Sequence, residues 1–192
     1  DYPQIAPKID VALYYAGDRE NGAVFKHANM MAAAAMLKAA GSVGSTELAE
    51  RLAKTAYWVI DCILPYRTLS SPYETCGNPR FCTQYNNSET GENIGPTLSG
   101  TSTWLLLCLF MGLGVSFGSD SLRIDPILRT ENTHCEYTVN TGKAGYHVVI
   151  TKPAEFRRSV EGVIIACDGE ELDGTSIPLF NDGKTHEILI RL

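Results

Sequence analysis

The sequence predicts an α+β fold in which a helical part is followed by a β-rich part. Three stretches of helical composition or spacing lie between residues 23 and 111, and short β-branched runs separated by turn signals come after residue 119. The 192 residues are 44% hydrophobic, which suits one medium domain or two small ones. We therefore expect a helical part over residues 1–118 and a β-rich C-terminal unit over residues 119–192.

The first two helices are predicted from composition and capping. Residues 23–40 are rich in Ala and Met and end at Gly41, and their small side chains imply close helix neighbours. A second helix is expected to begin with Ser45 as its N-cap and Glu47 in its first turn, where the helix dipole favours an anion. One apolar stripe runs along this helix, which is expected to end at Leu64.

A third helix is expected from about Thr101 to Met111. Apolar residues occur on every side of it, so it is predicted to be fully buried. Its apolar run is far shorter than the roughly 20 residues of a membrane-spanning helix. The preceding segment, residues 65–98, is rich in Pro, Asn, Gly and Thr and lacks periodicity, and long loops of this kind are often functional. Its aromatic and amide side chains are of types that bind sugars and could equally hold the loop together, namely Gln84, Tyr85, Asn86 and Asn87.

The β-rich unit is predicted from alternating runs and turn dipeptides. Thr141-Gly142, Asp168-Gly169, Asp173-Gly174 and Asp182-Gly183 suit tight antiparallel connections. The expected strands cover residues 135–140, 146–151, 160–167 and 185–192. We therefore expect a small antiparallel, sandwich-like structure in this part of the chain.

Charge and cysteine usage exclude some classes of function. The formal net charge of −6 argues against a nucleic-acid partner, which requires clustered Lys and Arg. The six cysteines form no Cys-x-x-Cys pair, so reduced thiols in a cytoplasmic protein are expected. A Cys76–Cys82 bridge and a metal site at His134-Cys135 are less favoured alternatives, because metal sites usually gather four ligands at recognisable spacing. No metal and no cofactor is expected.

A first group of polar residues precedes the first helix. Gly17 and Gly22 flank Asp-Arg-Glu-Asn, and His27 lies about one turn inside the predicted helix. Two glycines around four polar residues indicate a constrained turn that projects several polar groups together. A plain helix cap with a surface ion pair explains the pattern about equally well, and an isolated histidine there is more often a core residue than a ligand.

A second group lies where the third helix begins. The segment Gly95–Trp104 is rich in hydroxyl side chains and runs directly into the apolar helix. Free backbone N–H groups and the positive end of a helix dipole can hold an anion at such a place, and phosphate is the natural candidate. A simple N-cap made by Ser99 or Thr101 is the alternative. The segment matches neither a Walker A loop nor a nucleophile elbow.

These groups together resemble the inverting phosphorylases of the cellobiose, cellodextrin and chitobiose phosphorylase family. Arg19–His27 reads Arg-Glu-Asn-Gly-Ala-Val-Phe-Lys-His, similar to Lys/Arg-Glu-Asn-Gly-Gly-x-Phe-x-His in the family. Leu98–Trp104 is similar to the family's Ser/Thr-Gly-x-x-x-Trp. The segments Leu122–Pro126 and Ile177–His186 also look like the family's ending, and the order and spacing of the four matches agree across most of the chain.

The resemblance implies roles for particular residues. His27 and Ser99, with the Gly100 backbone, would hold inorganic phosphate, which is a co-substrate and not a cofactor. Arg19 and Glu20 would line the sugar subsites on either side of the scissile bond, and Gln84 would contact the donor glucose. The family's general acid is an aspartate upstream of the region present here, so no catalytic residue is expected in this chain.

The resemblance also implies a fold and an activity. Residues 1–118 would be a late part of an (α/α)6 toroid. The intact enzyme would convert a β-glucooligosaccharide and phosphate reversibly into α-glucose 1-phosphate and a shortened chain. Its partners would be these substrates and the upstream remainder of the enzyme, with a homodimer left open. This chain alone is expected to be inactive.

Several alternatives stay open at this stage. The segment Asn78–Ser88 and Ala23 look most like the 1,2-β-oligoglucan phosphorylases, with cellodextrin and laminaribiose phosphorylases as close alternatives. A non-catalytic carbohydrate-binding or structural fragment is an alternative of another class. A hydrolase on the same toroid would need a carboxylate pair, for which only Asp18, Glu20 and Glu92 lie near the proposed site.

Overall fold

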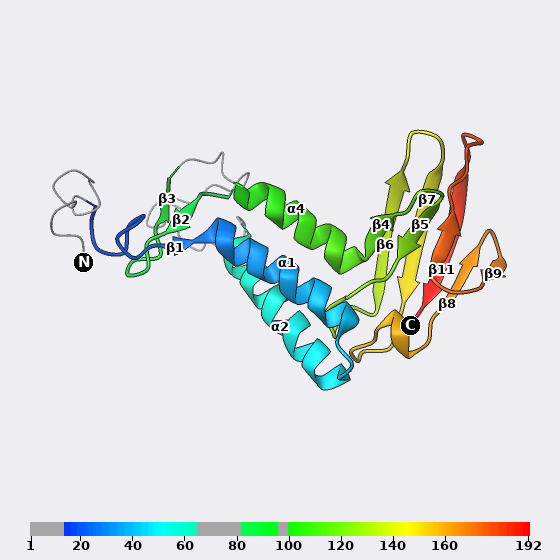
Figure 1. Ribbon diagram of the computed structural model, residues 1–192, viewed down its shortest axis with the longest axis horizontal. Helices are drawn as coiled ribbons and strands as arrows, with labels where there is room; N and C mark the ends of the chain where they lie inside the picture. The colour runs from blue at the N-terminus through cyan, green and yellow to red at the C-terminus, as the bar shows by residue number, and fades with distance from the viewer. Residues whose placement is uncertain (1–13, 65–81, 96–99) are drawn as a thin grey trace. The chain divides into compact units, whose positions relative to one another are not determined.

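The structure is a computed structural model that describes residues 14–64, 82–95 and 100–192 (Figure 1). Its contacts divide the chain into two compact units. The first unit is made of the described residues up to Ala35 and from Thr55 to Cys108, and the second of Met36–Lys54 and Leu109–Leu192. Each unit is considered by itself below. The boundary expected near residue 118 stays a prediction.

Three helices are present in the described part of the chain, close to where the sequence places them. They are α1 (Lys26–Ser42), α2 (Thr46–Ile63) and α4 (Gly100–Leu113). The predicted N-cap of α2 is confirmed, because the Ser45 hydroxyl accepts a hydrogen bond from the Leu48 N–H at 3.2 Å. The first helix begins later than predicted, since Val24 and Phe25 form a short strand, β1.

Small side chains allow the close packing expected around α1. Ala33 and Ala34 are at most 1% exposed. In the first unit, the Cys108 thiol donates to the Met30 carbonyl oxygen at 3.4 Å, which places α4 directly against the α1 backbone. The alanines of α1 are therefore contact residues between helices, as the composition indicates.

The expectation that the third helix is fully buried is wrong for this chain. Leu106 is 52% exposed, Leu109 56% and Phe110 43%. A helix that is apolar on every side needs neighbours on every side, and the described residues do not supply them. None of the helices among these residues is long and apolar enough to cross a membrane.

Two strands of a small sheet in the first unit lie within the segment 65–98, which lacks periodicity in the sequence. The sheet contains β1, β2 (Tyr85–Asn86) and β3 (Asn93–Ile94), all antiparallel, in the order β1-β2-β3. Phe25 pairs with Tyr85, and Tyr85 pairs with Ile94. This sheet connects the start of α1 to residues 85–94.

The second unit contains two sheets. The three-stranded sheet has the order β10 (Ser176–Pro178), β5 (Ser121–Ile124), β4 (Val115–Phe117). The five-stranded sheet has the order β6 (His134–Asn140), β7 (Gly145–Thr151), β11 (Thr185–Arg191), β8 (Ile164–Cys167), β9 (Glu170–Leu172). The run expected as one strand over 160–167 is a 3-10 turn at Ser159–Glu161 followed by β8.

The five-stranded sheet is mixed, whereas only antiparallel connections were expected. The β6–β7 and β8–β9 pairs are antiparallel, as their turn dipeptides predict. However, β11 runs parallel to β7 and antiparallel to β8 (Figure 1). Turn dipeptides specify only local hairpins, and β11 enters between two strands that are already made. Three helices with mixed sheets fit the α+β class.

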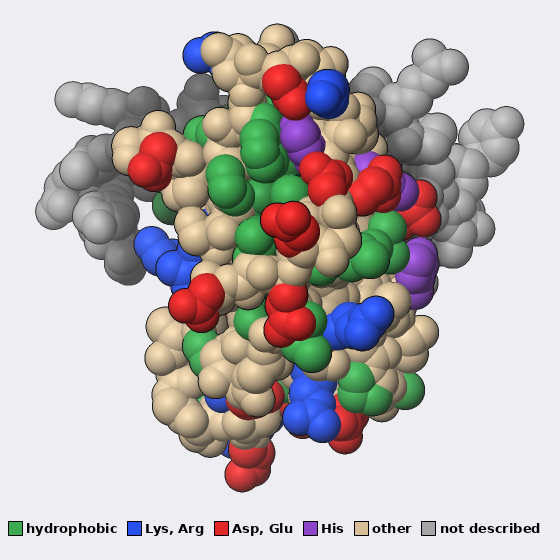
Figure 2. Space-filling view, turned by 90° about the vertical axis from the view of Figure 1, so that its right-hand side faces the viewer, with side chains coloured by type: hydrophobic (Ala, Val, Ile, Leu, Met, Phe, Trp, Pro, Cys, Tyr) green, Lys and Arg blue, Asp and Glu red, His purple; other side chains and the backbone are tan. Residues whose placement is uncertain are grey.

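The core of the second unit lies between its two sheets. Burial alternates along β7 and β11, as it does in strands with one face packed and one exposed. Leu122, Ile124 and Ile177 from the three-stranded sheet belong to one fully buried cluster with residues of the five-stranded sheet, namely Tyr146, Val148, Ile150, Ile188 and Ile190. Figure 2 shows acidic side chains spread over the end of this unit, with hydrophobic side chains between them.

Candidate functional site

The polar turn before α1 is tightly constrained. The Gly17 N–H donates to the Asn21 oxygen at 3.0 Å, and the Ala23 N–H donates to the Arg19 oxygen at 2.9 Å. Gly17 has a φ of +75°, and Arg19 has a φ of +44°, which is unusual for a residue with a side chain. A Cβ on Gly17 would lie 2.5 Å from Asn87 Oδ1. The turn therefore projects its polar side chains from a fixed backbone, as the flanking glycines predict.

The side chains of Asn87 and Asn86 hold the turn before α1 and the loop between β2 and β3 in place. Asn87 Nδ2 donates to the Ala16 oxygen at 3.1 Å, and its Oδ1 accepts from the Glu89 and Thr90 N–H groups at 2.8 and 3.0 Å. Asn86 Nδ2 donates to the Gly91 oxygen at 2.8 Å. Of the amide side chains that the sequence left open between sugar contact and loop support, these two serve as loop support.

His27 and Gly100 lie directly against each other. A Cβ on Gly100 would clash with the His27 ring, and the farthest of the three nearest ring atoms, Nδ1, would be only 2.8 Å away. Phe25 packs edge-on against the imidazole at 5.5 Å between ring centroids, and Trp104 lies at 6.5 Å. The structure thus brings together two residues to which the resemblance gives a common role.

Gly100 is the first residue of α4, so the imidazole lies at the N-terminal end of that helix. The first N–H groups of a helix have no partner within it, and they carry the positive end of the helix dipole. A cationic or N–H-donating imidazole at this end would add to the attraction for an anion. Ser99 lies outside the described residues.

Glu20 and Gln84 meet through Tyr85. The Tyr85 hydroxyl donates to Glu20 Oε1 at 3.3 Å, and Gln84 Nε2 donates to the same hydroxyl at 3.5 Å. The Tyr85 ring stacks on Phe25 with 5.1 Å between centroids. Burial and the nearby Glu20 carboxylate raise the pKa of Tyr85. These side chains form a polar edge beside the aromatic residues that pack on His27.

Arg19 lies on the exposed side of the turn. Its guanidinium carbon is 5.1 Å from the centre of the Tyr14 ring, a distance at which a cation is attracted to an aromatic face. Its Nε is 3.9 Å from an Asp18 carboxylate oxygen, so the ion pair expected from a plain cap is present but long. The Arg19 head group stays accessible from solvent.

Lys26 is a residue of this site that the sequence analysis missed. It is 1% exposed, and its ammonium donates to Thr83 Oγ1 at 2.8 Å and to Asn93 Oδ1 at 2.6 Å. Burial lowers the pKa of Lys26 to about 8. Lysines are almost never fully buried unless paired, so composition and spacing gave no signal. Lys26 ties the start of α1 to β3 and to the residue before Gln84.

Cysteines and possible metal ligands lie elsewhere. The five described cysteines are free, and burial raises the pKa of Cys108 to about 11, which keeps that thiol protonated. Among the described residues, Cys167, Asp168 and His186 form a group that could hold a metal ion. Both His186 nitrogens already contact carboxylates, Nδ1 with Asp168 at 2.7 Å and Nε2 with Asp182 at 3.3 Å. The group therefore serves as an ion-paired support for β11.

Comparison with known proteins finds glycoside phosphorylases, the class of enzyme that the motifs resemble. No protein-family model matches the chain. The chain is 28% identical over 165 residues to an N,N'-diacetylchitobiose phosphorylase of Vibrio furnissii, a match that covers 85% of this chain. It is 25% identical over 190 residues to a protein of the same name from Vibrio proteolyticus, covering 95% of this chain.

A third relative is named for a different substrate. The chain is 26% identical over 191 residues to a 3-O-beta-D-glucopyranosyl-beta-D-glucuronide phosphorylase of Paenibacillus borealis, covering 95% of this chain. The matches span only 19%, 22% and 23% of the lengths of the three relatives. Over most of its own length, therefore, this chain is similar to about a fifth of a glycoside phosphorylase.

Proposed function

We propose that this chain is part of an inverting glycoside phosphorylase and forms the phosphate-holding side of its active site. The observation that carries the proposal is the contact between His27 and Gly100 at the N-terminal end of α4. An imidazole beside the N-terminal end of a helix suits a phosphate dianion. The similarity to glycoside phosphorylases supplies a reaction in which phosphate is needed.

The chemistry of phosphorolysis explains why residues that bind phosphate suffice on this side of the active site, without a general base. An inverting hydrolase needs a general base to activate water, but phosphate is already an anionic nucleophile. Its oxygen would attack the anomeric carbon as the glycosidic C–O bond breaks, giving α-glucose 1-phosphate with inversion. The leaving oxygen would take its proton from a general acid outside this chain. His27 and Gly100 would only hold and orient the nucleophile.

The sugar would lie on the side of Glu20, Tyr85 and Gln84. A carboxylate, a phenol and an amide joined by hydrogen bonds offer acceptors and donors to sugar hydroxyls, and Phe25 fixes the Tyr85 ring by stacking. Arg19, held in a left-handed conformation next to Glu20, would contact the sugar across the scissile bond. These roles follow from the family resemblance, and the geometry is compatible with them.

For the substrate, we propose a β-glucooligosaccharide, with a β-1,2 linkage ahead of the β-1,4 and β-1,3 linkages of cellodextrin and laminaribiose. The proposal rests on Ala23 and on the segment 78–88, which resemble 1,2-β-oligoglucan phosphorylases. The helical part would be a late section of an (α/α)6 toroid, which agrees with the exposed apolar side chains of α4. A toroid would supply the neighbours that this helix needs.

The test is phosphate-dependent release of glucose 1-phosphate by the complete product of the gene. Glucooligosaccharides with β-1,2, β-1,3 and β-1,4 linkages are compared, and the preferred one identifies the linkage. His27→Ala is expected to raise the KM for phosphate at least about tenfold, which corresponds to about 1.4 kcal/mol. His134→Ala is the matched control, because His134 is exposed on β6 and belongs to the second unit.

The results separate the alternatives. Hydrolysis of the oligosaccharides without phosphate would favour a hydrolase on the same fold. Absence of any reaction by the complete product would favour a structural or carbohydrate-binding role. Equal effects of His27→Ala and His134→Ala on the phosphate KM would refute the phosphate site, even if phosphorolysis itself were found.

A further inference from the structure

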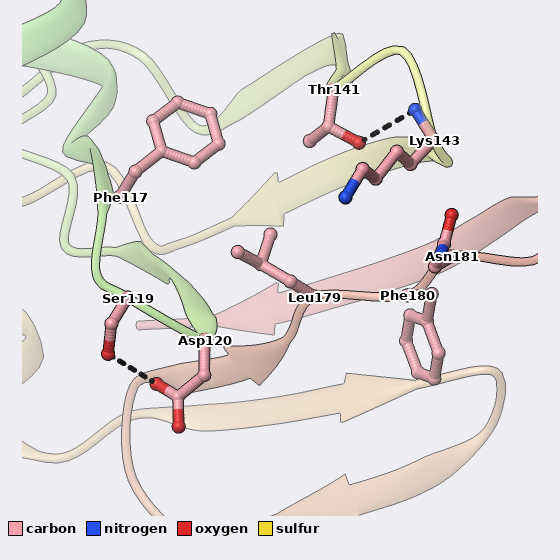
Figure 3. A pocket seen from close by; sticks show the side chains of 8 residues that line it. All are labelled: Phe117, Ser119, Asp120, Thr141, Lys143, Leu179, Phe180 and Asn181. Atoms are coloured by element: carbon pink, nitrogen blue, oxygen red, sulfur yellow. Dashed lines mark hydrogen bonds between the residues drawn. The ribbon is translucent and has the colours of Figure 1, made fainter.

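The second unit contains a pocket of about 550 Å³ that the proposed reaction does not use (Figure 3). Three loops form it: the β4–β5 turn, the β6–β7 turn and the segment after β10. All of its lining residues belong to the second unit, and none belongs to the phosphate site. Its volume is within the range of small-molecule sites, about 300–1,000 Å³.

The pocket combines an exposed aromatic ring with several polar groups. Phe117 is 57% exposed, which is high for a large apolar side chain. Figure 3 shows the Phe117 ring, Leu179 and the Lys143 side chain pointing toward a common space, with Asn181 at its rim. Within the described residues, the Lys143 ammonium and the Asn181 amide have no hydrogen-bond partner, and both are free to meet a ligand.

The frame of the pocket is fixed by backbone hydrogen bonds between its loops. The Leu179 N–H donates to the Asp120 oxygen at 3.1 Å, and the Gly183 N–H donates to the Lys143 oxygen at 2.9 Å. The Thr141 N–H donates to the Ala144 oxygen at 3.0 Å, which closes the β6–β7 turn. A frame that is already ordered loses little conformational entropy when a ligand binds.

The base of the pocket is formed by Phe180, which is held in place by His186 and Tyr146. Phe180 stacks on His186 with 3.8 Å between ring centroids, and its N–H donates to the Tyr146 hydroxyl at 2.7 Å. His186 is in turn held between Asp168 and Asp182. In Figure 3 the Phe180 ring points away from the space that Phe117 and Lys143 share. Phe180 therefore forms the base, and Phe117 is the ring offered to a ligand.

We propose that this pocket binds one pyranose residue of a carbohydrate, as an ancillary site separate from the reaction. The C–H face of a pyranose would pack on the Phe117 ring, whose π face attracts such hydrogens. Its hydroxyls would meet the Lys143 ammonium and the Asn181 amide, which together provide donors and an acceptor. An apolar wall with a few convergent polar groups is the usual composition of a ligand site.

The pyranose can come from two sources. It can be the end of an oligosaccharide chain, which the open mouth between the loops would admit. It can also be a free hexose or hexose phosphate, whose phosphate the Lys143 ammonium would attract. The ring chemistry is common to both, and the choice of probes distinguishes them.

The experiment is an NMR titration of the 15N-labelled 192-residue chain. Sophorotriose, cellotriose and laminaritriose test the chain-end source, and glucose and glucose 1-phosphate test the free source. Amide shifts are expected at Lys143, Leu179 and Asn181, with a Kd on the order of 1 mM. Binding of the trioses alone identifies the chain end, and binding of the monosaccharides identifies the free sugar.

Matched variants assign the binding to this pocket. Phe117→Ala is expected to weaken binding at least about tenfold, whereas Phe110→Ala, which removes an exposed phenylalanine of α4, leaves it unchanged. Lys143→Gln is compared with Lys38→Gln in the same way, in case Phe117→Ala alters the fold. The proposal fails if no probe shifts these amides at roughly tens of millimolar, or if Phe117→Ala and Lys143→Gln bind as the unmodified chain does.

Discussion

The His27 imidazole fills the space that a Cβ on residue 100 would need. Glycine at the first position of α4 therefore allows the ring and the helix end to touch, although the two residues are far apart in the sequence. Any larger residue at position 100 must move either the ring or the helix. The closeness of these two groups is the feature on which the proposed phosphate site depends.

Gly100→Ala is expected to impair the use of phosphate without unfolding the protein. The added methyl group would displace the His27 ring from the α4 N-terminus, so the KM for phosphate should rise about tenfold or more in the complete gene product. Initial rates at varied phosphate concentration measure the effect. Gly44→Ala is the control, because a Cβ there meets nothing within 4 Å. Equal phosphate KM values for the two variants would contradict the prediction.

Gly17→Ala is expected to destabilise the first unit more than Gly91→Ala. The two glycines have nearly the same φ, +75° and +76°, but only Gly17 would meet a neighbour, Asn87 Oδ1 at 2.5 Å. Backbone strain alone costs about 1 kcal/mol, and displacing Asn87 should add about 1–2 kcal/mol because its hydrogen bonds are lost. Urea unfolding of both variants measures the difference. A similar free energy of unfolding for both would show that Asn87 can be displaced at little energetic cost.

Lys26 is expected to make stability depend on alkaline pH. The folded pKa of about 8 lies below the ordinary 10.5, so below pH 8 the ammonium is charged in both states and its burial cost is complete. Between about pH 8 and 10.5 the unfolded chain binds more protons, so the free energy of unfolding contributed by Lys26 rises with pH.

The measurement for Lys26 is a comparison with Lys26→Met. The difference in unfolding free energy between the unmodified chain and this variant should shift by about 2 kcal/mol in favour of the unmodified chain from about pH 7 to about pH 10. Lys38→Met, at an exposed position of the same helix, should show no such shift. A constant difference for Lys26→Met over this range would mean that its pKa is not lowered.

Arg158→Ala is expected to destabilise the second unit strongly. Arg158 is 3% exposed, and its guanidinium donates to the Val43 oxygen at 2.6 Å, to Thr46 Oγ1 at 3.1 Å and to Glu161 Oε1 at 2.9 Å. Its loss removes these charge-assisted hydrogen bonds and the packing of a nearly buried side chain, and should cost about 3 kcal/mol. The neighbouring Arg157, half-exposed and paired with Glu155, should cost under about 1 kcal/mol as Arg157→Ala. Thermal and urea unfolding of the two variants measure the difference in stability.

The regular elements were predictable where a local pattern fixes them. The Ser45 cap marks the start of α2, and alternating apolar residues mark β7 and β11. The two-residue strands β1, β2 and β3 were not predictable, because so few residues carry no periodicity. The parallel β7–β11 pair was missed because pairing between distant strands leaves no local signal.

The candidate site was predictable only through resemblance. Neither composition nor spacing indicates that His27 meets Gly100, since either motif alone is explained by a helix cap. Lys26 was overlooked because its burial depends on Thr83 and Asn93, which lie in a segment without regular structure in the prediction. Conversely, Asn86 and Asn87 looked like sugar ligands by residue type, and their hydrogen bonds show that they support the loop.

The position of β11 in the middle of the five-stranded sheet affects how the second unit is made. The β6–β7 hairpin can form as soon as it leaves the ribosome, but β8 has no inner neighbour until residues 185–191 have been synthesised. From the synthesis of β8 until that of β11, the inner edges of β7 and β8 are therefore unpaired. A nascent chain in this state is open to chaperones and proteases, and the second unit becomes resistant to them only when β11 enters between the two strands.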